Sequence, residues 1–235
     1  MVKGKINCVW EKLNNEVLHE NVYGKNLQDE ALYVNCVWKK SVGRSLQDHG
    51  EGKRMETERL LLRRVLPGDE MDLLEIRNSE FVLKYNCMKK VTLEELQSQI
   101  VKDMEAEDIY SIVLKENSRV IGMVDISPDT LRYGVNAKGL SYYLGEQYTG
   151  KGYMSEALRE VIGYAFEELG VEVLSVRIFK ANEASKRLIE KLGFVHEGCI
   201  RSGVKGYGDI IYDDMIYSML RVEYIQSGAI RNNSI

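Results

Sequence analysis

The longest regular pattern of apolar residues lies in the second half of the chain. Its members are Met154, Leu158, Val161, Ile162, Ala165, Phe166 and Leu169. This spacing puts them on one face of a helix, and Gly170 is a typical residue for ending it. Leu174, Val176 and Ile178 then fall on one side of a strand at residues 173–179. The pattern predicts a long helix followed directly by a strand.

Similar patterns divide the rest of the chain from Met55 onward. Thr92 and Glu95 fit the capping-box pattern and open a helix that extends to about Ala106. Further strands are expected at residues 58–64, 109–115, 119–126, 139–144, 194–200 and 210–220, and further helices around residues 71–76 and at 183–192. Because strands and helices mix without strict alternation, we expect an α+β domain around a mixed sheet.

The first 54 residues differ from the rest. The tetrapeptide Asn-Cys-Val-Trp occurs at residues 7–10 and again at 35–38, and two copies are too few for a solenoid. A polar, Gly-rich linker follows at residues 48–54. We interpret residues 1–54 as an N-terminal extension of unknown role, 55–225 as the functional domain and 226–235 as a C-terminal tail.

Composition narrows the class of protein. The 235 residues are 44% hydrophobic and carry a net charge of −4, so no global field favours nucleic acid or an anionic membrane as a partner. No apolar run approaches the ~20 residues of a membrane-spanning helix, and no apolar segment of a signal peptide follows the basic N-terminus. The cysteines are far apart, at Cys8, Cys36, Cys87 and Cys199. We expect free thiols, no metal site and a cytoplasmic protein.

One glycine-rich loop has the chemistry of a phosphate site. It reads Gln147-Tyr148-Thr149-Gly150-Lys151-Gly152 and lies between a predicted strand and the long helix. Free N–H groups at a helix start bind anionic oxygens, and glycines let the backbone approach them closely. Residues 145–151 also fit the first seven positions of a Walker A motif, but Gly152 lacks the hydroxyl that binds magnesium there. A simple surface turn is the remaining interpretation.

A second motif follows at residues 182–194, with the sequence Asn-Glu-Ala-Ser-Lys-Arg-Leu-Ile-Glu-Lys-Leu-Gly-Phe. Together with the loop at residues 147–152 it resembles the GNAT acetyltransferase superfamily, which has a Q/R-x-x-G-x-G/A loop, a helix, a strand and an N-x-x-S/A…G-F segment in this order. Within the superfamily, the chain looks most like the Rim-type branch, which includes ribosomal-protein N-acetyltransferases. Shorter matches occur at residues 58–60, 152–158, 197–198 and 214–220. The resemblance covers about residues 55–224.

This resemblance implies a splayed sheet with acetyl-CoA between two parallel strands, at residues 141–144 and 173–179. Backbone groups near Leu144 and Gly145 are expected to bond the pantetheine arm, and the amides of residues 148–152 the pyrophosphate. The full set of implied cofactor contacts is Leu144, Gly145, Gln147, Tyr148, Thr149, Gly150, Lys151, Gly152, Tyr153, Asn182 and Ser185.

The acid and the base of the reaction are less well marked. Many superfamily members use a Tyr seven residues after the motif Asn to protonate the departing thiolate, and here that position is Ile189. Ser185 is the nearest substitute and resembles the serine of the Rim-type branch, although a serine in a first helical turn also caps backbone N–H groups. Glu197 is the predicted base, with strand-end hydrogen bonding as its alternative role.

Four other polar residues attract notice. We interpret Asp209 as part of a solvated turn, Tyr217 as a packing residue and Glu156 as a helix-start residue favoured by the dipole. Asp214 matches the branch's last strand without an assigned role.

The sequence therefore predicts an N-acetyltransferase in which a primary amine attacks the thioester of acetyl-CoA directly. The acceptor is a protein N-terminus or a small molecule, and the protein is a monomer or a homodimer. A non-catalytic acyl-CoA-binding module is the alternative, motivated by the missing tyrosine. A P-loop-like NTPase is the third interpretation.

Overall fold

The computed structural model describes residues 53–105 and 108–228. The predicted N-terminal extension, with Cys8 and Cys36, lies almost entirely outside the described residues. Most of the predicted C-terminal tail does too. Cys87 and Cys199 are free thiols.

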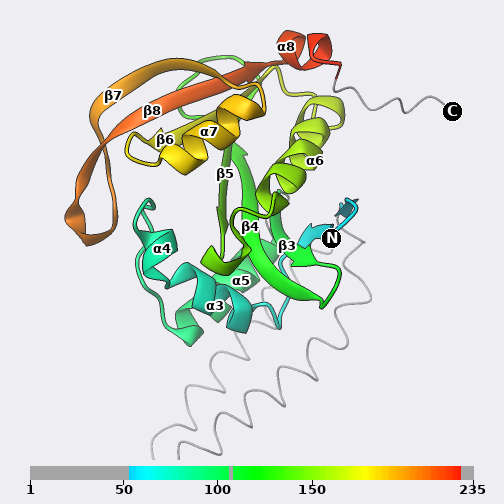
Figure 1. The fold of residues 1–235 in the computed structure, drawn as a ribbon, viewed down its shortest axis with the longest axis vertical. Coiled ribbons are helices and arrows are strands. Elements are labelled where there is room, and N and C mark those ends of the chain that lie inside the picture. The colour runs from blue at the N-terminus through cyan, green and yellow to red at the C-terminus, as the bar shows by residue number, and fades with distance from the viewer. Residues whose placement is uncertain (1–52, 106–107, 229–235) are drawn as a thin grey trace, which may run out of the picture. The chain divides into compact units, whose positions relative to one another are not determined.

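Eight strands form one mixed sheet (Figure 1). They are β1 (Met55–Glu56), β2 (Leu60–Arg64), β3 (Ile109–Leu114), β4 (Arg119–Pro128), β5 (Ala137–Leu144), β6 (Val173–Phe179), β7 (Val195–Lys205) and β8 (Ile211–Leu220). Their order across the sheet is β1-β2-β3-β4-β5-β6-β8-β7. Only the β5–β6 pair is parallel; every other neighbouring pair is antiparallel.

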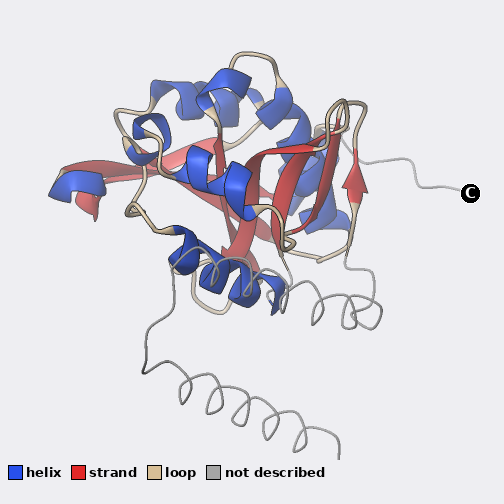
Figure 2. Cartoon of the chain, turned by 90° about the horizontal axis from the view of Figure 1, so that it is seen from below, coloured by secondary structure: helices blue, strands red, loops and turns tan. Residues whose placement is uncertain are grey.

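Helices cover both faces of this sheet, as the view in Figure 2 shows. They are α3 (Glu70–Arg77), α4 (Glu80–Leu83), α5 (Leu93–Glu105), α6 (Tyr153–Glu167), α7 (Glu183–Lys191) and α8 (Arg221–Gln226), with short 3₁₀ turns η1 (Glu146–Tyr148) and η2 (Tyr207–Asp209). The larger core lies under α6 and α7, which are drawn in front of the sheet in Figure 1. A smaller core lies under α3 and α5. The splayed, mixed α+β architecture expected from the sequence is confirmed.

The two patterns that were most regular in the sequence form as expected. Helix α6 turns its apolar stripe into the larger core, where Leu158, Val161 and Ala165 have no exposed surface. The capping box at the start of α5 is reciprocal: the Thr92 N–H donates to the Glu95 carboxylate at 2.8 Å, and the Glu95 N–H donates to Thr92 Oγ1 at 3.2 Å. The helix start is thus fixed by its own side chains.

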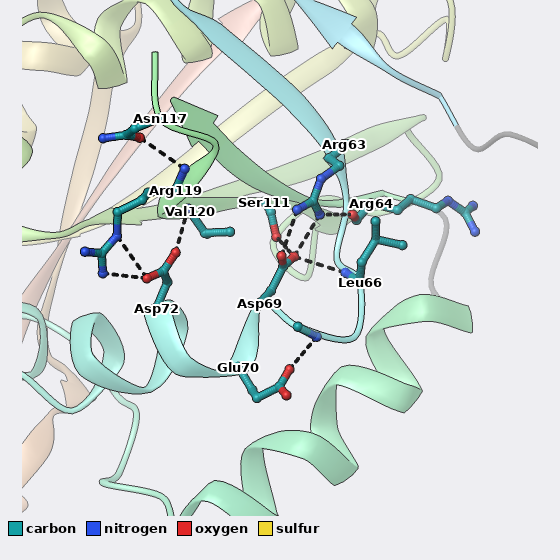
Figure 3. A network of polar contacts seen from close by, with 11 residues as sticks. Arg63, Arg64, Leu66, Asp69, Glu70, Asp72, Ser111, Asn117, Arg119 and Val120 are labelled. Atoms are coloured by element: carbon teal, nitrogen blue, oxygen red, sulfur yellow. Dashed lines mark hydrogen bonds and ion pairs between the residues drawn. The ribbon is translucent and has the colours of Figure 1, made fainter. Parts of the chain in front are cut away.

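Helix α3 is tied to the sheet by carboxylates near its N-terminus (Figure 3). Asp69, 5% exposed, accepts two hydrogen bonds from the Arg63 guanidinium at 2.7 and 2.8 Å and one from Ser111 Oγ at 2.8 Å. Asp72 accepts from the Arg119 guanidinium and from the Val120 N–H, at 2.6 and 3.0 Å. These bonds hold α3 against the face of the sheet opposite α6.

The secondary structure differs from the sequence-based expectation in three places. The strand predicted at residues 58–64 begins at Leu60, and the unpredicted two-residue strand β1 precedes it across a bend at residues 58–59. The short helices α4 and α8 were not predicted, since four and six residues carry too little helical periodicity to detect. Strand β7 continues to Lys205 rather than ending near Ile200, and its side chains are mostly exposed, so no alternation marks its length.

Candidate active site

The sheet opens between its two parallel strands. Strands β5 and β6 pair only at their first three residues, where Ala137, Lys138 and Gly139 face Val173, Leu174 and Ser175. Beyond Gly139 no pairing joins them, and Figure 1 shows β6 turning away from β5. The opening lies between residues 140–144 and 176–179, which are the strands that the resemblance assigned to acetyl-CoA.

The backbone of β5 presents polar groups to this opening. The Gly145 N–H points the other way and donates to the Ile121 carbonyl at 2.9 Å, while the Gly145 carbonyl accepts from Tyr148 at 3.0 Å. Because N–H groups alternate in direction along a strand, the amides of Tyr142 and Leu144 point toward β6. The Leu144 amide therefore faces the opening, whereas both backbone groups of Gly145 already have partners within the chain.

The glycine-rich loop ends at an uncapped helix start. Gly150 and Gly152 have φ of +72° and +80°, the left-handed region that favours glycine. Gly152 is the N-cap of α6, and no side chain bonds the amides of its first turn. Free N–H groups and a helix dipole at such a start are features that favour anions, and here they lie at residues 150–153. The Thr149 hydroxyl is not part of it, because it donates to the Glu146 carbonyl at 2.7 Å.

Arg59, the residue directly before β2, holds this loop in place. The Glu156 carboxylate accepts from Thr57 Oγ1 at 2.5 Å, from the Arg59 N–H at 2.9 Å and from Arg59 Nε at 2.7 Å. Arg59 Nη1 also donates to the Lys151 carbonyl at 3.0 Å, and the guanidinium lies over the Tyr153 ring. Burial acts to raise the pKa of Glu156, but these hydrogen bonds outweigh it and lower that pKa. The structural role expected for Glu156 agrees with these contacts, whereas the role of Arg59 was not predicted.

A cavity of about 310 Å³ occupies the opening and reaches both faces of the sheet. On the face of α6 and α7 it is lined by Leu140, Tyr142, Val176, Ile178, Asn182 and Ser185. On the opposite face its lining includes Tyr85, Asn86, Cys87, Ser141, Arg177 and Asp214. Successive residues of a strand point to opposite faces, so the splay lets groups from both sides meet in one space.

Asn182 and Ser185 lie together at the start of α7. The Ser185 N–H donates to Asn182 Oδ1 at 3.2 Å, so Asn182 caps the helix, and Ser185 Oγ lies 2.5 Å from the Tyr142 hydroxyl. Burial raises the pKa of Tyr142 to about 12, against a smaller opposing effect of the Ser185 hydrogen bond. Ile189 is fully buried in the larger core. Tyr142 was not singled out in the sequence, because its partner is 43 residues away and no local motif connects them.

Glu197 has contacts of a different kind. Its carboxylate accepts from Arg132 Nη2 at 2.5 Å and from Ser218 Oγ, and it is not among the residues that line the cavity. The structure therefore brings Ser185 and Asn182 together with the opening but does not bring Glu197 there.

The cavity's opposite face is built around an ion pair between the buried Asp214 and the partly exposed Arg177. Asp214, 1% exposed, accepts from Arg177 Nε at 2.6 Å. Next to this pair, burial and the Asp214 charge raise the pKa of the Cys87 thiol, and Arg177 partly opposes them. The Tyr207 N–H donates to the Asn86 carbonyl at 3.0 Å and so joins the β7–β8 hairpin to the loop after α4. Neither Arg177 nor Cys87 was predicted as a site residue.

The other polar residues noted in the sequence have structural surroundings. Asp209 is exposed and pairs with Lys205 at 3.2 Å, which agrees with a solvated turn. The Tyr217 ring is buried, and its hydroxyl donates to Glu190 at 3.2 Å. Burial, reinforced by Glu190, raises the pKa of Tyr217 to about 12.

Two wider features complete the site's description. Across residues 53–105 and 108–228, no helix has the length and apolar character needed to cross a bilayer. The same described residues contain no group of three or more His, Cys, Asp or Glu side chains arranged to hold a metal ion.

Similar sequences come from bacilli. The chain is 32% identical to YjcK of Bacillus subtilis strain 168, named as an N-acetyltransferase, over 55% of this chain and 69% of that protein. It is 30% identical to the uncharacterized N-acetyltransferase p20 of Bacillus licheniformis, over 71% of this chain and 95% of that protein. YdaF of B. subtilis, named as a ribosomal N-acetyltransferase, is 35% identical over 38% of this chain and 49% of its own length.

Solved structures share the fold at lower identity. A GNAT-family acetyltransferase from Bacillus anthracis superposes with a TM-score of 0.66 at 24% identity, over 72% of this chain and 99% of that one. A ribosomal-protein-S5-alanine acetyltransferase from Vibrio fischeri gives 0.65 at 22% identity, over 72% and 97%. RimJ of Mycobacterium smegmatis, in complex with CoA-disulfide, gives 0.60 at 15% identity, over 72% and 90%.

The profile of the acetyltransferase (GNAT) domain matches residues 59–195, which is more than half of the chain and includes both the glycine-rich loop and the start of α7. Ribosomal-protein acetyltransferases are among the similar sequences and structures, as the resemblance to the Rim-type branch predicted. The chain therefore belongs to the GNAT family of acetyltransferases and is an acyltransferase.

Proposed function

We propose that this protein transfers the acetyl group of acetyl-CoA to a primary amine, either the α-amine of a protein N-terminus or the amine of a small molecule. The observation that carries the proposal is the opening between β5 and β6. After β5 the chain passes through η1 to an uncapped helix start led by Gly152, and the Ser185 hydroxyl lines the cavity in the opening. One elongated molecule with a diphosphate at one end and a reactive thioester at the other matches this arrangement.

In this proposal the pyrophosphate binds the amides of residues 148–153, with Gln147 and Lys151 at the rim. The amides of Leu144 and Tyr142 bond the pantetheine arm, and Asn182 lies near the thioester. The rim charge of Lys151 adds attraction for phosphate oxygens. Gly145, whose backbone groups are already bonded, keeps the turn after β5 in shape instead of contacting the arm.

The acceptor amine enters from the opposite face of the sheet, where Ser141, Arg177 and Asp214 line the cavity. Its neutral nitrogen attacks the thioester carbonyl carbon, the C–S bond breaks, and the departing thiolate takes a proton from Ser185. An α-amine with a pKa of about 7.7–8.0 is partly neutral at neutral pH, while a lysine amine near 10.4 is not. An α-amine therefore suits this site better, because Glu197, the base predicted from the sequence, does not line the cavity and is held by Arg132 and Ser218.

The similar ribosomal N-acetyltransferase YdaF makes the N-termini of ribosomal proteins the first acceptors to test. The test uses the purified full-length protein with acetyl-CoA and a panel of N-terminal peptides, lysine peptides and small amines. Release of free CoA thiol that depends on the amine, with an acetylated product of the expected mass, is the predicted outcome. Lysine peptides accepted better than N-terminal peptides would contradict the preference for an α-amine.

The alternative is a module that binds acyl-CoA without turnover, and the buried Ile189 at the usual tyrosine position favours it. Acetyl-CoA binding by calorimetry without transfer to any amine of the panel would support that alternative. An NTPase is not proposed, because the position of the magnesium-binding hydroxyl is Gly152, the N-cap of α6.

A further inference from the structure

We infer that Tyr142 is the positioning residue through which Ser185 protonates the departing thiolate, so that a strand supplies the phenol that the α7 motif lacks. This inference rests on the proposed acetyl transfer. It concerns a residue that neither the family motifs nor the profile match distinguishes from its neighbours.

The two hydroxyls form a pair at the cavity wall. The Tyr142 oxygen and Ser185 Oγ are 2.5 Å apart, and both residues line the cavity. Tyr142 lies in the part of β5 that no longer pairs with β6, and Ser185 lies in the first turn of α7. Two hydroxyls hold two hydrogens, and the bond between them uses one. Whichever oxygen donates, the pair therefore keeps one O–H for a third group.

The surroundings fix the geometry of the pair. Asn182 Oδ1 accepts from the Ser185 N–H, which fixes the first turn of α7 and with it the position of Ser185 Oγ. The Tyr142 ring packs against the larger core, so the phenol approaches Ser185 from one side only. Burial raises the pKa of Tyr142 to about 12, so the phenol is protonated at neutral pH before the reaction begins.

The motif position at which many family members have a tyrosine carries no phenol in this chain. The side chain at position 189 is an isoleucine with no exposed surface, packed in the larger core. A tyrosine hydroxyl instead reaches Ser185 from β5, in the first turn of α7 and one turn before position 189. The site thus retains a phenol and a serine hydroxyl in contact, although the tyrosine of the motif is absent.

The tetrahedral adduct collapses, the C–S bond breaks and its electron pair stays on sulfur. The Ser185 hydroxyl proton moves to sulfur and forms the thiol, while the Tyr142 proton moves to Ser185 Oγ. The product amide nitrogen, which is cationic in the adduct, releases one proton to solvent, and solvent returns one proton to the Tyr142 phenolate. No other reactant is required.

The experiment compares Tyr142→Phe with Tyr143→Phe under single-turnover conditions with enzyme in excess, using the best amine from the panel. Tyr143 is the matched control, because the same hydroxyl is removed from the next residue of β5, where it contacts Met123 Sδ on the opposite face. We expect Tyr142→Phe to lower the acetyl-transfer rate constant by about 10²-fold, the lower end for general acid catalysis, with the acetyl-CoA Kd unchanged. Tyr143→Phe should remain close to wild type.

Two further readouts separate a proton-transfer role from a packing role. Ser185→Ala and the Ser185→Ala/Tyr142→Phe double variant should be equally slow, because residues that act as one unit are not additive. The rate in mixtures of H₂O and D₂O should depend on deuterium content along a curve in wild type, where two protons move, and along a straight line in Tyr142→Phe. Circular dichroism and the melting temperature check that each variant is folded.

Three outcomes would overturn the inference. A Tyr142→Phe rate equal to that of Tyr143→Phe would remove Tyr142 from the reaction while leaving the proposed transfer intact. So would a defect confined to the acetyl-CoA Kd. A wild-type protein that binds acetyl-CoA but acetylates no amine would overturn the proposed function and this inference together.

Discussion

Replacing Arg59 by Met should weaken acetyl-CoA binding without slowing the chemical step. Arg59 does not line the cavity, yet its side chain bonds both Glu156 in α6 and the Lys151 carbonyl in the glycine-rich loop. Methionine keeps a long unbranched side chain and removes the guanidinium, together with its contact over the Tyr153 ring. The loop would then lose the bonds that hold its amides in one arrangement.

The size of the effect follows from exposure and geometry. Arg59 donates to Glu156 at 2.6 and 2.7 Å and to Lys151 at 3.0 Å, but its side chain is 41% exposed. Fully exposed ion pairs contribute about 0.2–1 kcal/mol, and hydrogen bonds to charged groups about 1.5–3 kcal/mol. Partial exposure puts the Arg59 contacts at about 1–2 kcal/mol, which corresponds to an acetyl-CoA Kd raised about 5- to 30-fold.

The assay measures the acetyl-CoA Kd by calorimetry and kcat at saturating acetyl-CoA. Arg119→Met is the matched control, because Arg119 has a similar half-exposed ion pair, with Asp72 at 2.6 Å, on the α3 side of the sheet. Both variants should lose similar stability, but only Arg59→Met should raise the Kd, with kcat unchanged in each. Equal Kd values in the two variants would refute the idea that Arg59 organises the loop.

Three further predictions concern the loop, the scaffold and pH. Gly150→Val should weaken acetyl-CoA binding through backbone strain of about 1–2 kcal/mol at φ +72°, since nothing lies within 4 Å of an added Cβ; Gly134→Val, at φ +68° in the β4–β5 connection, is the calorimetric control. Asp69→Ala should cost about 3–5 kcal/mol in urea unfolding, because the Arg63 guanidinium loses its buried partner, and a midpoint like that of wild type would contradict this. The pKa of Glu156 is lowered by folding, so its contribution to stability is present above the usual Glu pKa of about 4.3 and is lost as pH falls toward the folded value. The difference in unfolding free energy between wild type and Glu156→Gln should therefore shrink between about pH 6 and pH 3.

Local signals in the sequence were sufficient for most of the fold. The apolar stripe of α6 and the capping box of α5 act within one element, so periodicity and spacing identify them. Helix α4 has only four residues and follows a bend, so it carries no detectable period. The length of β7 was missed because a strand exposed on both faces has no alternating pattern.

The residues of the candidate site also fall into two groups, those with a local signal in the sequence and those without one. Glycines at 150 and 152 are local requirements of backbone geometry, and both were singled out from the sequence, whereas the helix cap that Asn182 provides was not predicted. The contact between Tyr142 and Ser185 depends on how β5 packs against α7, which no spacing encodes. Glu197 illustrates the opposite case: its position near the motif suggested chemistry, but its ion pair is with Arg132, 65 residues earlier in the chain.

The brief pairing of β5 with β6 also has a mechanical consequence. Only three residue pairs join the five strands on one side of the sheet to the three on the other, so few backbone bonds resist separation along this seam. In the proposed complex, an extended pantetheine arm bonded to β5 takes the place of the missing stretch of strand. Bound acetyl-CoA would then connect the two parts of the sheet. Its departure as free CoA would weaken this connection at the place where the acetylated product leaves.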